Sequence, residues 1–470
     1  MREAEDVVDE EQHVLALVAE MLGDGKARKR HAHACARRLV HLAKHHARLL
    51  DHAAAGVADL RFLHFQPQIG PFALAEVCEV MKLASSEGWT VLPAGAMTWP
   101  DAGRTSPSPH IIVSTQRLNR LIEHEPADLI AITEAGVTLK DFNDALMQKG
   151  QWLPLDPPDD GHATIGGVVA TGLGGAQQFG YGPPRKHVIG MKVVLADGSL
   201  IKVGGRVVKN VAGYDLCKLF TGSYGTLGVI VELNFKLRPL PFKTSTTIVS
   251  GKREDLLAGA RRVIDSRLFP VALELLSPRF AYEAEWTEGS DHLLLIRFAG
   301  SLSGIAEQTI STGALFKKNH CGKPGPPVPD DTMIWNTLAA LLSRLQGDLV
   351  WRVGLQPADV PTFLAKLDQE NESKGSSELM WQASIGDGRI RVVNRLRPGG
   401  ESGDDRIRRL ELFQSLAKSL GSRLIIEHAS VEIKDHLANT RGTFADGYGI
   451  MLRIKQHLDP DGIFPSLSAY

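Results

Sequence analysis

The sequence predicts an α+β fold with two domains behind an N-terminal appendage. The chain has 470 residues, which is more than one ordinary hydrophobic core can organise. Short runs of apolar and β-branched residues alternate with segments of helical period, an order typical of mixed folds rather than helical bundles. One series of such runs closes at the Arg-Pro-Leu-Pro of residues 238–241, and a second series follows at once. We therefore expect domains at residues 61–241 and 242–470.

The appendage, residues 1–60, differs from the rest of the chain in composition. An acidic run at 3–11 is followed by a basic, histidine-rich run at 26–52. His41 and His45 lie one helical turn apart, a spacing that can hold a metal, but no further ligand at a matching spacing completes a site. We expect a helical or disordered segment with a solvated face.

The sequence of the first domain predicts alternating strands and helices. Amphipathic period predicts helices, and β-rich runs predict strands. Asp197 and Gly198 are the turn of a hairpin. The expected helices are 72–87, 138–149 and 216–221, and the expected strands are 90–93, 111–114, 129–133, 188–196, 199–203 and 228–237.

The second domain repeats a β/α order, which suggests one α+β unit of about 200 residues. Residues 322–329, Gly-Lys-Pro-Gly-Pro-Pro-Val-Pro, are expected to be an irregular surface loop because proline removes backbone donors. A final helix near 447–457 is expected to return toward the first domain. The other expected helices are 253–266, 360–370 and 406–420, and the strands are 272–276, 292–298, 350–353, 380–383, 390–393 and 423–427.

Composition excludes several function classes. A net charge of −1 argues against nucleic acid as the main partner. No run of about 18 apolar residues occurs and the N-terminus is acidic, so we expect a soluble, cytoplasmic protein. The four cysteines, Cys35, Cys78, Cys217 and Cys321, are too far apart for an iron–sulphur or zinc motif and are expected to be reduced thiols.

Two glycine-rich stretches, at 156–182 and 204–230, are the strongest local signal. Glycines between short apolar runs let the backbone approach a large anionic ligand closely, which predicts a dinucleotide. Three segments in order could wrap it: 91–99, 164–175 and 222–230. Neither the Rossmann fingerprint nor the P-loop fits their spacing.

These motifs carry a resemblance to a known family. In order they are P-x-G-x-x-T at 93–98, D-P-P at 156–158, T-I-G-G-x-x-A-T-x-x-x-G at 164–175 and V-K-N-V-A-G-Y-D at 208–215. The chain resembles FAD-linked oxidases of the vanillyl-alcohol oxidase and p-cresol methylhydroxylase (PCMH) type, and most narrowly the FAD-binding subunit of glycolate oxidase (glycolate dehydrogenase). The resemblance covers about residues 65–465. It implies a two-lobed FAD-binding domain of the PCMH type followed by an α+β cap domain.

The resemblance also implies which residues hold the cofactor. FAD is expected to be noncovalent, since neither His nor Cys occupies the loop at 93–99. Ala96, Met97 and Trp99 replace two glycines and a serine of the family loop, so their side chains narrow the approach to phosphate. The implied pyrophosphate residues are Pro93, Ala94, Gly95, Ala96, Met97 and Thr98 with Thr164, Ile165, Gly166 and Gly167; Asp156, Pro157, Thr171, Gly174 and Gly175 lie along the cofactor, and Gly225, Thr226, Gly228 and Ile230 hold its adenine or ribose end.

The cap is where the resemblance places substrate chemistry. Residues 384–391 correspond to a family segment whose two histidines are replaced here, and no metal site is expected. Arg389 and Arg391 are candidates for binding a substrate carboxylate, against the alternative of surface arginines. His428 is a candidate base, against the alternative of ordinary packing.

Three hypotheses follow. The first is an FAD-binding subunit of a glycolate or D-lactate oxidising complex, passing electrons from a 2-hydroxy acid to an iron–sulphur partner beside a catalytic flavoprotein subunit, at the inner face of the membrane through those partners. The second is a stand-alone FAD-dependent dehydrogenase of a 2-hydroxy acid or alcohol that uses His428 and a cap arginine. The third is a structural subunit that has lost its flavin.

Overall fold

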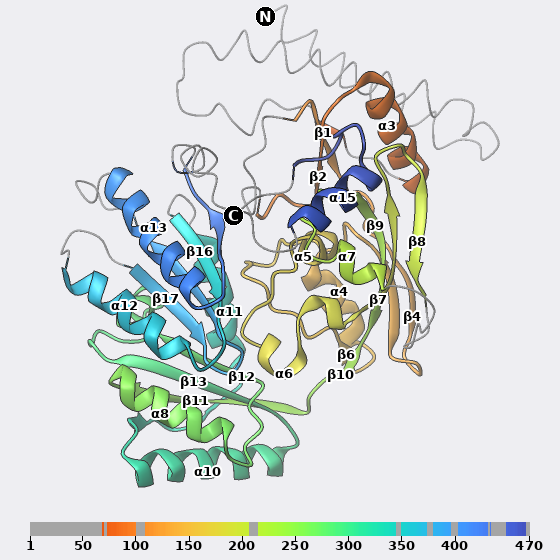
Figure 1. Ribbon diagram of the computed structural model, residues 1–470. Coiled ribbons are helices and arrows are strands. Elements are labelled where there is room, and N and C mark those ends of the chain that lie inside the picture. Colours follow the sequence, from red (N-terminus) through yellow and green to blue (C-terminus); the bar gives the residue numbers. More distant parts are fainter. Residues whose placement is uncertain are drawn as a thin grey trace, which may run out of the picture.

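The computed structural model describes residues 68–69, 73–99, 109–205, 215–344, 349–373, 379–395, 403–430, 433 and 448–466. The predicted appendage and most of the K-N-V-A-G-Y-D motif lie outside these residues. Figure 1 shows two sheet-based bodies, one formed by the chain up to β10 and the other by the chain from β11 to β19.

The first body begins with a small parallel sheet in the order β1-β3-β2. Helix α3 (Leu74–Glu87) covers it, because its apolar residues recur at helical spacing and are buried against the strands. The helix ends at Gly88, whose φ of 66° suits a left-handed cap. The strands are β1 (Gln68–Ile69), β2 (Val91–Ala94) and β3 (Ile111–Ser114).

A five-stranded antiparallel sheet, in the order β4-β5-β9-β7-β8, forms the rest of the first body. One hydrophobic cluster packs its strands against helices α4, α5 and α7, and a second packs residues of β7 and β9 with α3. The strands are β4 (Leu121–Glu125), β5 (Ile130–Glu134), β7 (Val188–Val194), β8 (Leu200–Gly204) and β9 (Val229–Lys236). The helices are α4 (Leu139–Met147), α5 (Ile165–Thr171), α6 (Gln178–Tyr181) and α7 (Leu216–Phe220), and β6 (Gln151–Trp152) pairs with β10 (Arg238–Pro239).

The second body is a nine-stranded sheet in the order β14-β11-β13-β12-β17-β18-β16-β19, with β15 also on β11. Its two halves meet where β12 pairs with β17, which agrees with the repeated β/α order in the sequence. The strands are β11 (Lys243–Gly251), β12 (Ala272–Leu276), β13 (His292–Gly300), β16 (Leu349–Gly354), β17 (Leu379–Ser384), β18 (Arg389–Asn394) and β19 (Leu424–His428), and the helices are α8 (Arg253–Ile264), α9 (Pro278–Glu283), α10 (Leu302–Asn319), α11 (Thr332–Arg344), α12 (Val360–Ser373) and α13 (Gly403–Ser419).

The prediction for residues 322–329 was wrong in part. Two short strands, β14 (Lys323–Pro324) and β15 (Val328–Pro329), pair with the outer edge of β11. Proline is tolerated there because an edge strand needs only some of its backbone donors. Helices α10 and α11 were not predicted, and no element was predicted for the glycine run at 165–171, where α5 forms.

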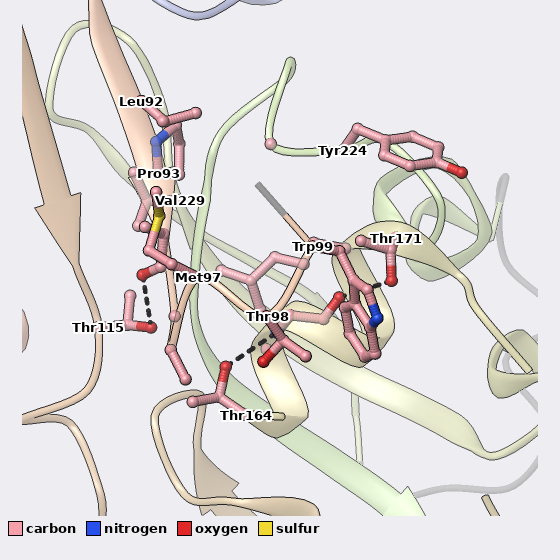
Figure 2. A pocket seen from close by; sticks show the side chains of 18 of the residues that line it. Leu92, Pro93, Met97, Thr98, Trp99, Thr115, Thr164, Thr171, Tyr224 and Val229 are labelled. Carbon is pink, nitrogen blue, oxygen red and sulfur yellow. Dashed lines mark hydrogen bonds between the residues drawn. The ribbon is translucent and has the colours of Figure 1, made fainter. Parts of the chain in front are cut away.

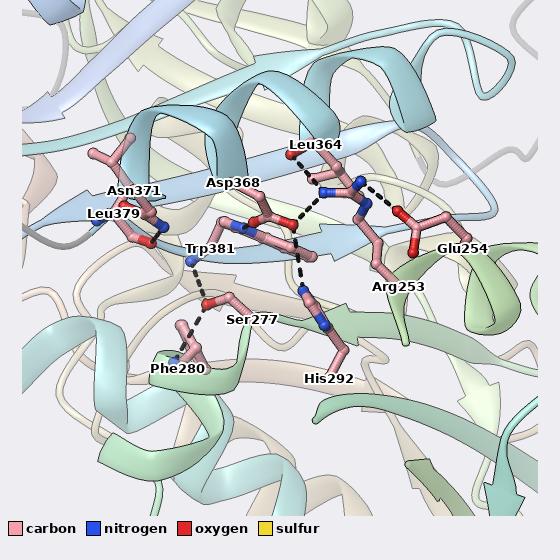
Figure 3. Close-up of polar contacts among 10 residues, drawn as sticks. All are labelled: Arg253, Glu254, Ser277, Phe280, His292, Leu364, Asp368, Asn371, Leu379 and Trp381. Atoms are coloured by element: carbon pink, nitrogen blue, oxygen red, sulfur yellow. Dashed lines mark hydrogen bonds and ion pairs between the residues drawn. The ribbon is translucent and has the colours of Figure 1, made fainter. Parts of the chain in front are cut away.

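A partly buried polar cluster ties helices α8 and α12 to the sheet of the second body (Figure 3). Asp368 on α12 accepts hydrogen bonds from Arg253 on α8 and from Trp381 Nε1 on β17, the latter at 3.0 Å. His292 Nε2 lies 3.6 Å from the same carboxylate. Burial alone would raise the pKa of Asp368, but the bonds from His292 and Trp381 hold that pKa below its usual value.

The last helix, α15 (Tyr448–Leu458), lies against the first body (Figure 1). Its Ile454 and Leu458 pack on the core under the five-stranded sheet. Lys455 Nζ donates to the carbonyl oxygen of Thr226 at 2.8 Å and pairs with Asp459. The Asp459 side chain in turn accepts from the backbone of Ile463 and Phe464, so the C-terminal Asp-Pro-Asp-Gly turn is tied to the glycine-rich loop before β9.

Candidate active site

A cavity opens in the first body where three glycine-containing segments meet. The loop after β2, the start of α5 and the turn before β9 form its wall (Figure 2). The empty space is about 810 Å³, part of it open to solvent. We call it the glycine cavity; its lining residues are Leu92, Pro93, Ala94, Gly95, Ala96, Met97, Thr98, Trp99, Thr115, Thr164, Gly166, Gly167, Ala170, Thr171, Tyr224, Gly225, Gly228, Val229 and Ile230.

Glycines let these backbone segments approach one another. A Cβ on Gly95 would meet Thr164 Oγ1 at 2.0 Å, and one on Gly166 would meet the Ala135 Cβ and carbonyl oxygen at 2.8 Å. Gly225 differs, because its φ is +70° and a Cβ there would lie 3.4 Å from Pro93 at the cavity wall. Gly95 and Gly166 are therefore required for neighbouring segments of the protein to pack closely. Gly225 instead leaves space at the cavity wall for a ligand.

The two bulky replacements in the loop after β2 are accommodated differently. Met97 adopts a φ of 59°, the left-handed region in which the family loop has glycine. Trp99 donates from Nε1 to the Pro158 carbonyl oxygen at 2.9 Å and packs against the core. Both side chains still line the cavity, as Figure 2 shows. The loop is thus shaped by its own side chains as well as by glycine.

A second cavity lies between the two bodies and adjoins the first, because Thr171 and Tyr224 line both. It encloses about 1180 Å³ of empty space, including its open mouth. We call it the arginine cavity; its lining residues are Thr171, Gly172, Leu173, Gly174, Gly175, Gln178, Pro183, Pro184, Arg185, Thr221, Gly222, Tyr224, Arg352, Val353, Gln382, Ser384, Arg389, Ile390, Arg391 and Ile425.

Strand register explains why polar residues gather on one wall of the arginine cavity. Side chains alternate between the faces of a strand, so residues paired directly across neighbouring strands share a face. One cross-strand row is Glu274–Ser384–Arg389, and the neighbouring row contains Gln382, Arg391 and Arg352. The opposite face of the same strands carries Leu273, Trp381 and Trp351 and is covered by helices.

The arginines outnumber the carboxylates that pair with them. Arg391 binds Glu427 through two contacts, of 2.7 and 3.1 Å. Arg352 Nε lies 3.0 Å from the same carboxylate, and its Nη2 donates to Tyr224 Oη at 3.1 Å. Arg389 pairs with Asp387 at 2.8 Å. Three arginines thus share two carboxylates, and like charges opposite one another in a sheet are unfavourable unless an anion balances them.

Two further carboxyl groups are fully buried near this wall. Burial raises the pKa of Glu274 to about 7, although Arg389 and bonds from Ser384 and Gln382 oppose the shift. Burial likewise raises the pKa of Asp156 to about 6, against the opposing effects of the Gln177 backbone N–H and Arg389. Both groups titrate close to neutral pH, which is unusual for structural carboxylates.

The structure brings most of the predicted site residues to these cavities, but not all. Asp156 lines a small hollow beside the arginine cavity. Pro157, Ile165 and Thr226 line neither main cavity; Ile165 is 1% exposed, and Thr226 bonds to Ser223. His428 pairs with Val350 of β16 at a register shift that leaves Glu427 as the extra residue of β19, and it is not among the residues that line either cavity.

Several residues at the site were missed by sequence reasoning. Arg352 contacts Tyr224 of the first body and Glu427 of the second. Ser384 and Gln382 form the neighbouring wall, and both bind Glu274 behind it. The alternation of polar residues at 382 and 384 and at 389 and 391 was the available signal. It indicates one polar sheet face, but only the strand order shows that the two pairs are adjacent.

The glycine cavity has the features of a flavin-binding site, and comparison with known proteins identifies the class. Residues 69–204 match the FAD binding domain family. The chain is therefore a flavoprotein oxidoreductase with FAD as its cofactor. Over these residues the chain is similar to FAD-linked oxidoreductases of the PCMH type, which is the resemblance that the motifs predicted.

Relatives extend over both bodies. A D-lactate dehydrogenase of Archaeoglobus fulgidus is 29% identical over 84% of this chain and 89% of its own length. A D-2-hydroxyglutarate dehydrogenase of Stutzerimonas stutzeri is 25% identical, over 85% and 90%. Glycolate oxidase subunit GlcD of Bacillus subtilis is 34% identical, but the match spans only 44% of each chain.

A solved structure supports the fold alone. Alkyldihydroxyacetonephosphate synthase superposes with a TM-score of 0.62 at 16% identity, over 84% of this chain and 76% of that one. In the described part of the chain, no group of three His, Cys, Asp or Glu side chains is placed to hold a metal ion. None of the helices in the same residues is long and apolar enough to cross a membrane.

The described residues fit FAD. Gly225 keeps the wall of the glycine cavity open beside Pro93. This cavity adjoins the arginine cavity, which is lined by several arginine side chains. The residues that would hold the cofactor are those of the loop after β2, the start of α5 and the turn before β9. No lining residue of the glycine cavity is a histidine or cysteine, and noncovalent attachment stays a prediction.

Proposed function

We propose that this chain is an FAD-dependent 2-hydroxy-acid dehydrogenase whose substrate binds in the arginine cavity. The observation that carries the proposal is a cavity next to the FAD site whose lining residues include four arginines, Arg185, Arg352, Arg389 and Arg391, and no Asp or Glu. A small carboxylate would balance that charge, and guanidinium groups bind carboxylates through paired, charge-assisted hydrogen bonds.

The chemistry divides between cofactor and protein. FAD, when bound, accepts the C2 hydrogen of the substrate together with its two bonding electrons. The protein must orient the carboxylate, exclude water and receive the hydroxyl proton. Arg352 and Arg391 have the charge and position for the first task. The names of the relatives, D-lactate and D-2-hydroxyglutarate dehydrogenase, support a 2-hydroxy acid as the substrate class.

The test is reduction of the bound flavin by substrate without oxygen. Purified protein is reconstituted with FAD and mixed anaerobically with glycolate, D-lactate, L-lactate or D-2-hydroxyglutarate. We expect at least one of them to bleach the flavin absorbance. If dithionite reduces the flavin but no 2-hydroxy acid does, the proposal is wrong.

A matched pair of arginine variants tests the carboxylate site. Arg352→Gln removes one guanidinium and leaves the paired contacts of Arg391 with Glu427 in place. It should raise KM for the bleaching acid by about tenfold to a hundredfold, the worth of one charge-assisted hydrogen bond. The control is Arg408→Gln, whose side chain is 74% exposed on α13. Equal effects of the two variants would exclude a specific role for Arg352.

A second candidate assigns the chain to a complex. We infer this from the cap segment at 384–391, where Ser384 and Arg391 stand at the family's histidine positions, and from the glycolate oxidase subunit among the relatives. In that case a catalytic flavoprotein and an iron–sulphur subunit accompany the chain, in the cytoplasm or at the inner face of the membrane. Co-expression and affinity purification test it: both partners should co-elute, and a chain that reduces a dye at full rate alone would contradict it.

A further inference from the structure

Glu274 is a buried acid directly behind the polar wall of the arginine cavity. It lies on β12, its exposed fraction is 0%, and its direct strand neighbour on β17 is Ser384. Its neighbour on β13 is Leu295, which belongs to an apolar cluster. A carboxyl group in such a place costs free energy when ionised, so its retention needs a reason beyond packing.

Both hydrogen-bond partners of Glu274 line the arginine cavity. Ser384 Oγ donates to Glu274 Oε1 at 2.5 Å, and Gln382 Nε2 donates to Oε2 at 2.8 Å. Glu274 itself does not line the cavity, so it meets a ligand only through these side chains. Gln382 Oε1 is buried with no hydrogen-bond partner among the described residues, which leaves an acceptor available to a ligand donor.

The hydroxyl of Ser384 has two hydrogen-bonding states, set by Glu274. When Glu274 is ionised, the Ser384 hydrogen points to the carboxylate, and Oγ offers only lone pairs to the cavity. When Glu274 is protonated on Oε1, its own hydrogen can donate to Ser384 Oγ, and the Ser384 hydrogen is free to turn to a ligand. The first state accepts from an alcohol, whereas the second donates to a carbonyl.

We propose that Ser384 and Glu274 together receive the proton of the substrate's 2-hydroxyl group, Ser384 by direct contact and Glu274 as the residue that stores the proton. This inference rests on the proposed function. The substrate O–H bond breaks and its proton passes to Ser384 Oγ, while the Ser384 proton passes to Glu274 Oε1. The C2 hydrogen and its bonding pair leave to the flavin, so the alcohol becomes a carbonyl and no proton is left unplaced.

The charges around Glu274 support its role as the group that stores the proton. Arg389, across Ser384 on β18, favours the ionised carboxylate, and Asp387 in the adjoining turn opposes it. Arg297 reaches the same sheet face from β13 but is held by Asp331. With burial included, the pKa of Glu274 is about 7, so both states are populated near neutral pH.

The experiment is proton-linked binding of oxalate to the FAD-loaded protein. Oxalate has only acceptor oxygens and no hydrogen to transfer, so it should select the protonated state of Glu274. Calorimetric titration in buffers of different ionisation enthalpy counts the protons taken up. At pH 8 a group with a pKa near 7 is about nine-tenths ionised, so we expect uptake of about 0.9 proton per oxalate bound.

Variants of Glu274 and Ser384 test whether Glu274 is the group that takes up this proton. Glu274→Gln imitates the protonated acid, so it should bind oxalate at pH 8 about tenfold more tightly than the wild type and take up no proton. Ser384→Ala should lose the uptake and Ser384→Thr should keep it. Flavin reduction by a hydroxy acid should slow by about a hundredfold in Glu274→Gln, the usual worth of a proton acceptor.

The possible failures are distinguishable. No oxalate binding to the wild type would overturn the proposed carboxylate site, and with it this inference. Oxalate binding without proton uptake, or with uptake that persists in Glu274→Gln, would overturn the role of Glu274 and leave the carboxylate site standing. Uptake that disappears in Asp156→Asn instead would assign the proton to the other buried acid.

Discussion

Replacing Glu274 by glutamine should stabilise the protein at alkaline pH. The pKa of Glu274 rises from 4.5 to about 7 because the folded chain buries it. Between these values the folded state holds more protons than the unfolded state, so the free energy of unfolding falls as pH rises. A difference of about 2.5 pKa units corresponds to about 3 kcal/mol above pH 7, and glutamine avoids this cost.

The assay compares thermal and urea unfolding of wild type and Glu274→Gln from pH 5 to pH 8. The advantage of the variant should be below about 1 kcal/mol at pH 5 and about 3 kcal/mol at pH 8. Glu288→Gln is the matched control, because Glu288 is exposed in the same body. A variant that is equally or less stable at pH 8, or an advantage that does not grow with pH, would refute the titration of a buried Glu274.

Two further predictions concern the cavity walls. Gly225→Leu should weaken FAD binding by about tenfold or more in a flavin fluorescence titration, whereas Gly88→Leu, with a similar φ but open space around it, should bind FAD normally; equal loss in both would point to backbone strain alone. Glu427→Gln should lower stability by about 1–3 kcal/mol, because Arg352 and Arg391 then face each other without their shared carboxylate. Oxalate should raise the melting temperature of that variant more than that of the wild type, and an equal rise would contradict an anion site there.

The sequence predicted the fold class and the segments that line the glycine cavity because their signals are local. Alternation and helical period depend on neighbours a few residues away, so elements such as α3, β7 and α8 were predicted to within a few residues. Glycines at 95 and 166 mark places where neighbouring segments pack too closely for a side chain. The helix α5 was missed because four of its first five positions, Gly166, Gly167, Val168 and Val169, are poor helix formers.

The polar wall could not be predicted because it depends on strand order. Ser384 and Arg389 are close in sequence, but Glu274 precedes them by more than a hundred residues and meets them only because β12 pairs with β17. Arg352 reaches the same wall from β16, and no sequence spacing marks it. His428 was attractive for its residue type, yet it is Glu427 that contacts the arginines, at a point where the register of β19 with β16 shifts and no sequence spacing indicates it.

A crystal structure of the protein with FAD and oxalate tests the central claim most directly. We predict cofactor density in the glycine cavity, with the loop at 93–99 and Gly225 in contact with it. We also predict oxalate in the arginine cavity within hydrogen-bond distance of Arg352 or Arg391, and in contact with Ser384. FAD bound elsewhere, or oxalate bound away from both arginines, would contradict it.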